Sequence, residues 1–212
     1  MLQYCQGDVF MKKIIITLGR QFGCGARDIG KRVAENLGID YFDKEIMKIA
    51  AKESGIDEKL FAYYDERPSR SFLYNVSLEG YSFMNNTAST IEDRVFQYQF
   101  EAIKKAGEKS CVIVGRCADY IFDGDESAFR VFIRADDDYR LKRVMNKYSM
   151  DEKSASKEIR NVDKKRAKFH DFYSDSKWGD ASSYDLCINV SKLGADNAVD
   201  IICECAKRFV GE

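Results

Sequence analysis

Residues 12–38 read KKIIITLGRQFGCGARDIGKRVAENLG. The run at 14–18 is apolar and rich in β-branched residues, which predicts a buried strand. Gly38 stands where the C-terminal cap of a helix would stand. Before it, apolar residues recur at the spacing of one helix face, at Ile29, Val33, Ala34 and Leu37. The predicted order is therefore strand, glycine-rich turn, helix.

The turn at 19–27 has the composition of an anion-binding loop. Glycines let the backbone curl so that successive N–H groups point inward, and the start of a helix adds a partial positive charge. The phosphate chain of a nucleotide is the natural ligand of such a loop. The alternative is that Gly23 and Gly25 only make a tight turn.

This loop departs from the usual phosphate-binding sequence G-x-x-x-x-G-K-[ST]. If Gly25 is the second glycine, Arg20 takes the place of the first. The lysine and hydroxyl positions then become Ala26 and Arg27. Arg27 opposes the helix dipole, which is unfavourable unless an anion binds there. A guanidinium can hold phosphate oxygens in a bidentate manner, so Arg27 could stand in for the lysine.

The composition predicts one globular domain without a membrane or nucleic-acid surface. The chain has 212 residues, of which 45% are apolar, and a formal net charge of −1. It contains no long basic stripe, no apolar run near the roughly 20 residues of a membrane span, and no signal-peptide core. We expect a cytoplasmic protein with a single domain at 12–212. Residues 1–11 are expected to be a disordered or non-native leader, with Met11 as an alternative start.

The cysteines and the single histidine do not indicate a metal site. The seven cysteines form no C-x-x-C pair, and several lie in apolar runs, as small buried residues do in a reducing compartment. His170 is the single histidine, so the sequence lacks the histidine ligands of a typical zinc site. Cys24 lies near a helix start, where a thiol can become a nucleophile, but the C-x5-R spacing of cysteine phosphatases is absent.

Polar residues follow two further apolar segments. The segment at 39–43 ends in Asp43, which is either a site residue at the carboxyl edge of a sheet or the N-cap of a helix at 44–54. The strand at 111–116 ends in Gly-Arg and would bring Arg116 to the same edge as the glycine-rich loop.

The remaining pattern alternates strands with helices. Strands are predicted at 129–135 and 184–189, and helices at 90–107, 151–170 and 195–209. This order predicts an α/β fold, with a doubly wound parallel sheet and right-handed crossovers.

Two charged helices and one aromatic segment carry further candidates. Arg140 and Arg143 lie three residues apart on one helix face, and another helix spaces Arg160, Asp163 and Arg166 along one side. Solvated surfaces are the alternative for both helices. The segment at 57–90 is rich in aromatic, serine and asparagine residues and predicts an insertion or flap, where Arg67 and Arg70 either reach a substrate anion or form a charged turn.

As a set, six segments resemble the cytidylate kinase-like family, a branch of the P-loop nucleoside monophosphate kinases. They are 20–30 (RQFGCGARDIG), 41–43 (YFD), 114–116 (VGR), 162–166 (VDKKR), 178–180 (WGD) and 184–189 (YDLCIN). The resemblance runs from Lys12 to the C-terminal helix. It implies a P-loop-type core that binds ATP at the glycine-rich loop, a helical acceptor-side insertion at 57–90, and an arginine-rich helical lid at 140–180.

The resemblance also implies roles for individual residues. The donor phosphates would be bound by Arg20, Gly23, Cys24, Gly25, Ala26, Arg27 and Asp28. The acceptor would be bound by Asp43, Arg116, Asp163 and Arg166, where Asp163 orients the base or the arginines. Catalytic positive charge would come from Arg27, Arg116, Arg143, Arg160 and Arg166, with Arg140 also in the lid. The implied cofactor is ATP with Mg²⁺, and no residue is singled out as a metal ligand. Cytidylate kinases proper carry a lysine followed by small residues where this loop has Ala26 and Arg27.

These features predict ATP-dependent phosphoryl transfer to a nucleoside monophosphate, with CMP as the first acceptor to test. Such transfer needs mainly positioned positive charge, which converging arginines supply. Two alternatives stay open: a nucleotide-binding regulatory protein without transfer activity, favoured by the missing lysine, and a kinase for a non-nucleotide metabolite. We expect a small-molecule nucleotide substrate, no nucleic-acid or membrane partner, and a homodimer as one possible assembly, with an interface on the aromatic-rich insertion.

Overall fold

The computed structural model describes residues 12–64 and 91–211. The predicted leader at 1–11 lies outside these ranges, as do Arg67, Arg70 and most of the predicted insertion at 57–90. The part of that segment that is described contains the helix α3 (Glu58–Tyr64).

A parallel sheet of five strands forms the centre of the molecule, which confirms the predicted α/β fold class. The strand order is β2-β3-β1-β4-β5, and every neighbouring pair is parallel. The strands are β1 (Ile15–Arg20), β2 (Asp40–Phe42), β3 (Cys111–Val114), β4 (Ala128–Arg134) and β5 (Leu186–Asn189). Because β1 lies between β3 and β4, the glycine-rich loop that follows β1 emerges at the middle of the carboxyl edge.

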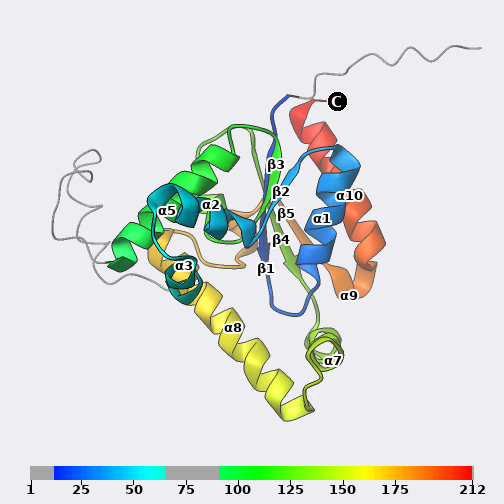
Figure 1. Cartoon of the computed structure of the whole chain (residues 1–212). Helices are drawn as coiled ribbons and strands as arrows, with labels where there is room; N and C mark the ends of the chain where they lie inside the picture. The colour runs from blue at the N-terminus through cyan, green and yellow to red at the C-terminus, as the bar shows by residue number, and fades with distance from the viewer. Residues whose placement is uncertain (1–11, 65–90, 212) are drawn as a thin grey trace, which may run out of the picture.

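Helices cover both faces of the sheet (Figure 1). One face carries α1 (Ala26–Leu37) and α10 (Ala195–Val210), and the other carries α2 (Glu45–Ser54), α3 and α5 (Ile91–Ala106). Successive residues of a strand point to opposite faces. Ile16 and Leu18 therefore pack in the α1 and α10 core, whereas Ile15 packs in the α2 and α5 core. Burial on both faces explains why β1 reads as a continuous apolar run.

A long helix crosses the carboxyl edge of the sheet. It is α8 (Glu152–Tyr173), and it is joined to α7 (Asp137–Tyr148) at one end and reaches α5 at the other (Figure 1). Near its start, Ala155 and Ile159 pack with Val144 of α7 and with Phe22 of the glycine-rich loop. Near its end, the Tyr173 ring stacks on Phe96 of α5 at a centroid distance of 3.9 Å.

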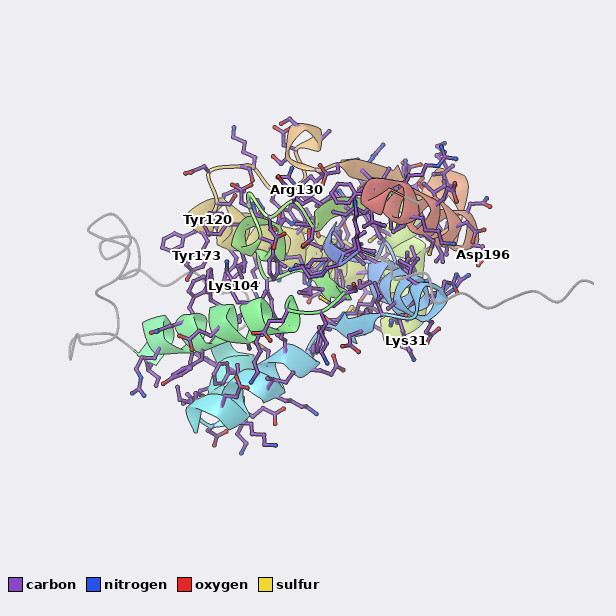
Figure 2. All side chains as sticks on the ribbon, turned by 90° about the horizontal axis from the view of Figure 1, so that it is seen from above. Lys31, Lys104, Tyr120, Arg130, Tyr173 and Asp196 are labelled. Carbon is purple, nitrogen blue, oxygen red and sulfur yellow. The ribbon has the colours of Figure 1, made fainter. Side chains whose placement is uncertain are left out.

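Three short helices complete the described chain: α6 (Ala118–Ile121), η2 (Ala181–Ser183) and α9 (Val190–Leu193). The helices predicted at 90–107, 151–170 and 195–209 correspond to α5, α8 and α10. Seen from above, Lys31 and Asp196 point outward from α1 and α10, as the charged sides of surface helices do (Figure 2).

The cysteines only partly match the expectation that they are small buried residues. Cys111, Cys117 and Cys203 are buried, but Cys187 is exposed at the edge strand β5. Within 12–64 and 91–211, no helix is both long and apolar enough to cross a lipid bilayer.

Candidate functional site

The glycine-rich loop takes a conformation that its glycines make possible. Gly23 and Gly25 have φ values of +83° and +91°, where residues with a side chain are strained. A Cβ on Gly23 would lie 2.9 Å from Val144 Cγ2, so α7 packs directly against the loop. The helix α1 begins after Gly25 without a side-chain cap, which leaves N–H groups of its first turn for a ligand.

Asp163 of α8 holds this loop in place. Its Oδ1 accepts a hydrogen bond from the Phe22 N–H at 2.7 Å, and its Oδ2 pairs with the buried Arg140 of α7. Arg140 also donates to the Phe22 carbonyl at 3.4 Å and pairs with Asp137. Both oxygens of Asp163 are thus occupied with the loop and α7. Asp163 lies outside the linings of the two pockets described below, so its expected part in acceptor binding stays a prediction.

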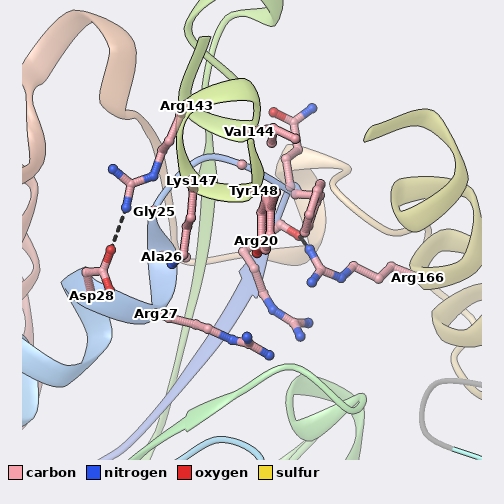
Figure 3. Close-up of a pocket in the computed structure, with 13 residues that line it drawn as sticks. Arg20, Gly25, Ala26, Arg27, Asp28, Arg143, Val144, Lys147, Tyr148 and Arg166 are labelled. Atoms are coloured by element: carbon pink, nitrogen blue, oxygen red, sulfur yellow. Dashed lines mark hydrogen bonds and ion pairs between the residues drawn. The ribbon is translucent and has the colours of Figure 1, made fainter. Parts of the chain in front are cut away.

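A pocket, here called the loop pocket, lies between the glycine-rich loop, α7 and α8 (Figure 3). Its lining residues are Arg20, Gln21, Phe22, Gly23, Gly25, Ala26, Arg27, Asp28, Arg143, Val144, Lys147, Tyr148 and Arg166. The guanidinium groups of Arg20, Arg27 and Arg166, from β1, α1 and α8, point toward the same region (Figure 3). The loop pocket is therefore rich in positive charge, as a polyphosphate site has to be.

Two of these arginines make contacts within the pocket wall. Arg143 pairs with Asp28 in the first turn of α1 (Figure 3). Arg166 donates to the Arg20 carbonyl at 3.2 Å, and its guanidinium lies 5.8 Å from the centre of the Phe22 ring. Arg166 thus contacts the strand end and the loop at once.

Asp43 does not cap α2, and its carboxylate instead pairs with two arginines. Its Oδ2 pairs with Arg27 Nε at 2.7 Å, and its Oδ1 lies 3.6 Å from Arg116 Nη1. Arg116 also donates to the Asp43 carbonyl at 3.0 Å. The N-cap residue of α2 is Lys44, and no side chain caps that helix. The pairing follows from the strand order, because β2 and β3 are neighbours and both end at the carboxyl edge.

A second pocket, here called the edge pocket, lies beside the loop pocket at the ends of β1 and β3. Its lining residues are Gly19, Arg20, Gly115, Arg116, Cys117, Asp119, Arg166, Phe169, His170, Trp178 and Tyr184. The turn after β3 takes three successive positive φ values, at Gly115, Arg116 and Cys117. Such strain in a residue with a side chain is typical of functional sites. A Cβ on Gly115 would clash with the Arg20 guanidinium, so this glycine lets Arg20 lie against the turn.

His170 and Asp119 form a buried pair in the edge pocket. His170 Nε2 lies 2.8 Å from Asp119 Oδ2. Burial opposes protonation, but the Asp119 carboxylate, together with Asp171, outweighs it and raises the pKa of His170. Burial and the same Asp119 charge raise the pKa of Tyr184. Sequence reasoning did not single out Asp119, although it lies one helical turn after Arg116.

Five of the predicted residues line neither pocket, namely Cys24, Asp43, Arg140, Arg160 and Asp163. Arg160 is exposed and donates to Ser156 Oγ at 2.6 Å, within α8 itself. Cys24 is buried, and burial raises the pKa of its thiol, which is the opposite of the exposed, low-pKa setting of a nucleophilic cysteine. Any contact of residue 24 with an anion would have to come from its backbone. Conversely, Lys147 and Tyr148 line the loop pocket although the sequence did not indicate them.

No preformed metal cage occurs in the described part of the chain, where His, Cys, Asp and Glu side chains form no cluster of three suited to a metal ion. Asp28 is the acidic residue that lines the loop pocket, and it is paired with Arg143. This donor set fits Mg²⁺ that arrives with a polyphosphate, because Mg²⁺ usually keeps several waters and takes one or two carboxylates besides phosphate oxygens.

The chain is similar in sequence or fold to several known proteins. A solved structure of an uncharacterized protein from Eubacterium ventriosum is 31% identical, with a TM-score of 0.69, and the match covers 92% of this chain and 98% of that one. The shikimate kinase of Bacteroides thetaiotaomicron has the same fold, with 13% identity, a TM-score of 0.54 and coverage of 91% and 97%. A protein named cytidylate kinase from Methanopyrus kandleri is 22% identical over 196 residues, which are 92% of this chain and 93% of that protein.

The match to a family model is equally extensive. The model of the cytidylate kinase-like family aligns with residues 15–192, which include the glycine-rich loop, both pockets and the whole sheet. The chain therefore belongs to the cytidylate kinase-like family.

Proposed function

We propose that the protein transfers the γ-phosphoryl group of ATP to a nucleoside monophosphate, with CMP as the first acceptor to test. Membership of the cytidylate kinase-like family supports nucleotide-dependent phosphoryl transfer. The observation that carries the proposal is the contact between two positively charged pockets: Arg20 and Arg166 line both the loop pocket and the edge pocket. A donor in one and an acceptor in the other would meet at these two side chains.

The loop pocket is the donor site in this proposal. The phosphates of ATP would lie against the first turn of α1, where no side chain caps the helix and the helix dipole is favourable. Arg27, Arg143 and Lys147 would balance the phosphate charge. Mg²⁺ bound to the phosphates would neutralise further charge, and Asp28, the acidic residue of this lining, would help to hold it.

The edge pocket is the acceptor site. Arg20, Arg116 and Arg166 supply positive charge for a phosphate, while Trp178 and Tyr184 supply flat aromatic surface for a ring. Charge together with aromatic surface fits an acceptor that carries both a phosphate and a base. A neutral metabolite would make no use of the positive charge that Arg20, Arg116 and Arg166 bring to this pocket.

The residues of this site suit transfer between phosphates. An oxygen of the acceptor phosphate attacks the γ-phosphorus and forms a new P–O bond. The bond from the γ-phosphorus to the β–γ bridging oxygen breaks, and ADP leaves with the electron pair. The attacking oxygen of a phosphate dianion carries no proton, so the step needs positioned positive charge and no general base. We propose that the segment at 140–180 closes as a lid and excludes water, which would otherwise hydrolyse ATP.

A coupled assay of ADP formation tests the proposal against a panel of nucleoside monophosphates. We expect acceptor-dependent turnover with at least one of them, and a large loss in an Arg116→Gln variant. Arg134→Gln is a matched control, because Arg134 ends β4 but is exposed and lies outside both pockets. No turnover with any nucleoside monophosphate would reject the proposal. ATP binding without ADP release would instead support a regulatory protein, and turnover with other acceptors alone would support a metabolite kinase.

A further inference from the structure

The usual phosphate-binding loop carries a lysine that reaches the β- and γ-phosphates, and this chain has Ala26 at that position. A methyl group carries no charge, and Ala26 is buried against the core. Transfer between two bound phosphates nevertheless needs a fixed positive charge where donor and acceptor meet. Another side chain must supply that charge if the protein transfers phosphate.

We propose that Arg20, held in place with Arg166, supplies the charge of the missing lysine and is a catalytic residue. This inference rests on the proposed function. Arg20 is the last residue of β1 and is only 6% exposed. It lines both pockets, and its guanidinium lies against Gly115 of the edge pocket and points toward the same region as Arg166 in Figure 3.

The surroundings of Arg20 fix its position before any substrate binds. Gly115, which has no side chain, leaves the space that the Arg20 guanidinium occupies. Arg166 donates to the Arg20 carbonyl at 3.2 Å and lines the same two pockets. Because both residues line the same two pockets, a phosphate bound where the pockets meet would lie near two positive charges. Charge that is positioned in advance stabilises a transition state without reorganisation.

The other cations of the two pockets are less well placed. Arg27, the sequence-based candidate, has a side chain that is 43% exposed, and it pairs with Asp43 at 2.7 Å. It lines the loop pocket alone, as do Lys147 and Arg143, and Arg143 pairs with Asp28. Arg116 lines the edge pocket alone and donates to the Asp43 carbonyl. These four would bind one substrate each, whereas Arg20 can contact the group in transit.

During transfer, negative charge moves from the γ-phosphoryl group to the oxygen that leaves with ADP, while the acceptor oxygen loses charge to its new bond. A guanidinium at the junction stabilises the equatorial phosphoryl oxygens and the leaving oxygen together. Arginine stays protonated throughout, so it acts by charge and hydrogen bonding and transfers no proton.

Three variants of Arg20 and Arg27 test this role, with turnover and binding measured separately. We expect Arg20→Gln to lower kcat by roughly 10²–10³-fold, the loss that follows removal of one transition-state donor, while KM changes much less. Arg20→Lys keeps the charge and should retain much more activity than Arg20→Gln. Arg27→Gln should raise KM for ATP more than it lowers kcat. The single tryptophan, Trp178, lines the edge pocket, so its fluorescence reports acceptor binding without turnover.

Different results separate the inference from the proposed function. No turnover by the wild-type protein would overturn both. If the wild-type protein turns over and the kcat of Arg20→Gln stays within about threefold of the wild-type value, the role of Arg20 is overturned and the proposed function stands. If Arg20 had only a structural role, Arg20→Gln would have a lower unfolding temperature and no Trp178 fluorescence response to the acceptor, and Arg20→Lys would not restore activity. That set of results would also overturn the catalytic role of Arg20. If Arg20→Gln does not fold, Arg166→Gln is measured in its place. We expect its kcat to be at least tenfold lower than that of the wild type, and an unchanged kcat in Arg166→Gln would contradict the proposal. Arg134→Gln is the control throughout.

Discussion

Replacing Asp163 with alanine should destabilise the protein strongly, because Asp163 ties three segments together. Its carboxylate accepts from the Phe22 N–H of the glycine-rich loop and pairs with Arg140 of α7, while the residue itself belongs to α8. The side chains of Arg140 and Asp163 are only 8% and 17% exposed. Alanine would leave a nearly buried guanidinium and a backbone N–H without this carboxylate.

The expected size follows from these contacts. Removing one partner of a buried ion pair costs about 3–5 kcal/mol. We take about 3 kcal/mol of unfolding free energy, the low end, because Arg140 keeps its second partner Asp137, which is 91% exposed. At about 2–4 °C per kcal/mol for a chain of this length, Tm should fall by about 6–12 °C. Asp163→Asn should lose nearly as much, since its amide nitrogen would face one of two donors, the Phe22 N–H or the Arg140 guanidinium.

Chemical and thermal denaturation followed by circular dichroism would measure the loss. Asp200→Ala is the matched control, because Asp200 is an exposed acidic residue within α10; it should stay within about 0.5 kcal/mol of the wild type. The double variant Arg140→Met/Asp163→Ala should be more stable than Asp163→Ala, because no buried charge is left unpaired. A loss within about 0.5 kcal/mol for Asp163→Ala, or a loss in the double variant equal to the sum of the two single losses, would contradict this role of Asp163.

Three further predictions concern single residues. Gly23→Ala should lower the unfolding free energy by about 1–2 kcal/mol, because φ is +83° there, and should weaken ATP binding; unchanged denaturation curves and affinity would contradict this. In the folded protein Asp119 raises the pKa of His170. Protonated His170 therefore stabilises the fold fully at pH values below its unfolded pKa of about 6.5, and this contribution to the unfolding free energy is lost as pH rises through the folded pKa. The stability difference between wild type and His170→Asn should therefore shrink from pH 6 to pH 9, and a constant difference would refute the assignment. Thiol labelling of the native protein, read by mass spectrometry, should modify the exposed Cys187 and spare the buried Cys24; early labelling of Cys24 would show that the loop opens.

Local patterns were sufficient for the fold and for the general position of the site. The apolar run before the glycine-rich turn, the helical spacing after it, and the alternation of strands and helices predicted the parallel sheet. Since the carboxyl ends of parallel strands share one edge, Asp43 and Arg116 could be expected at one place, and the structure pairs them. These inferences need only neighbouring residues and the rules of strand connection.

Partnerships between distant residues were not predictable in this way. The sequence of a charged helix such as α8 does not indicate which side chains face solvent and which face the core. Arg160 and Asp163 therefore looked equivalent, yet Arg160 is exposed and Asp163 holds the glycine-rich loop. His170 offered no pattern at all, because its partner Asp119 is 51 residues away.

The sequence by itself determined that a positively charged, glycine-rich loop lies at the carboxyl edge of a parallel sheet, because strand and helix periodicities are local properties. Only the tertiary structure decided which charges serve the loop, which bind each other and which line both pockets. That choice depends on how α7 and α8 cross the sheet edge, since the direction of a guanidinium is set by packing across more than a hundred residues of chain.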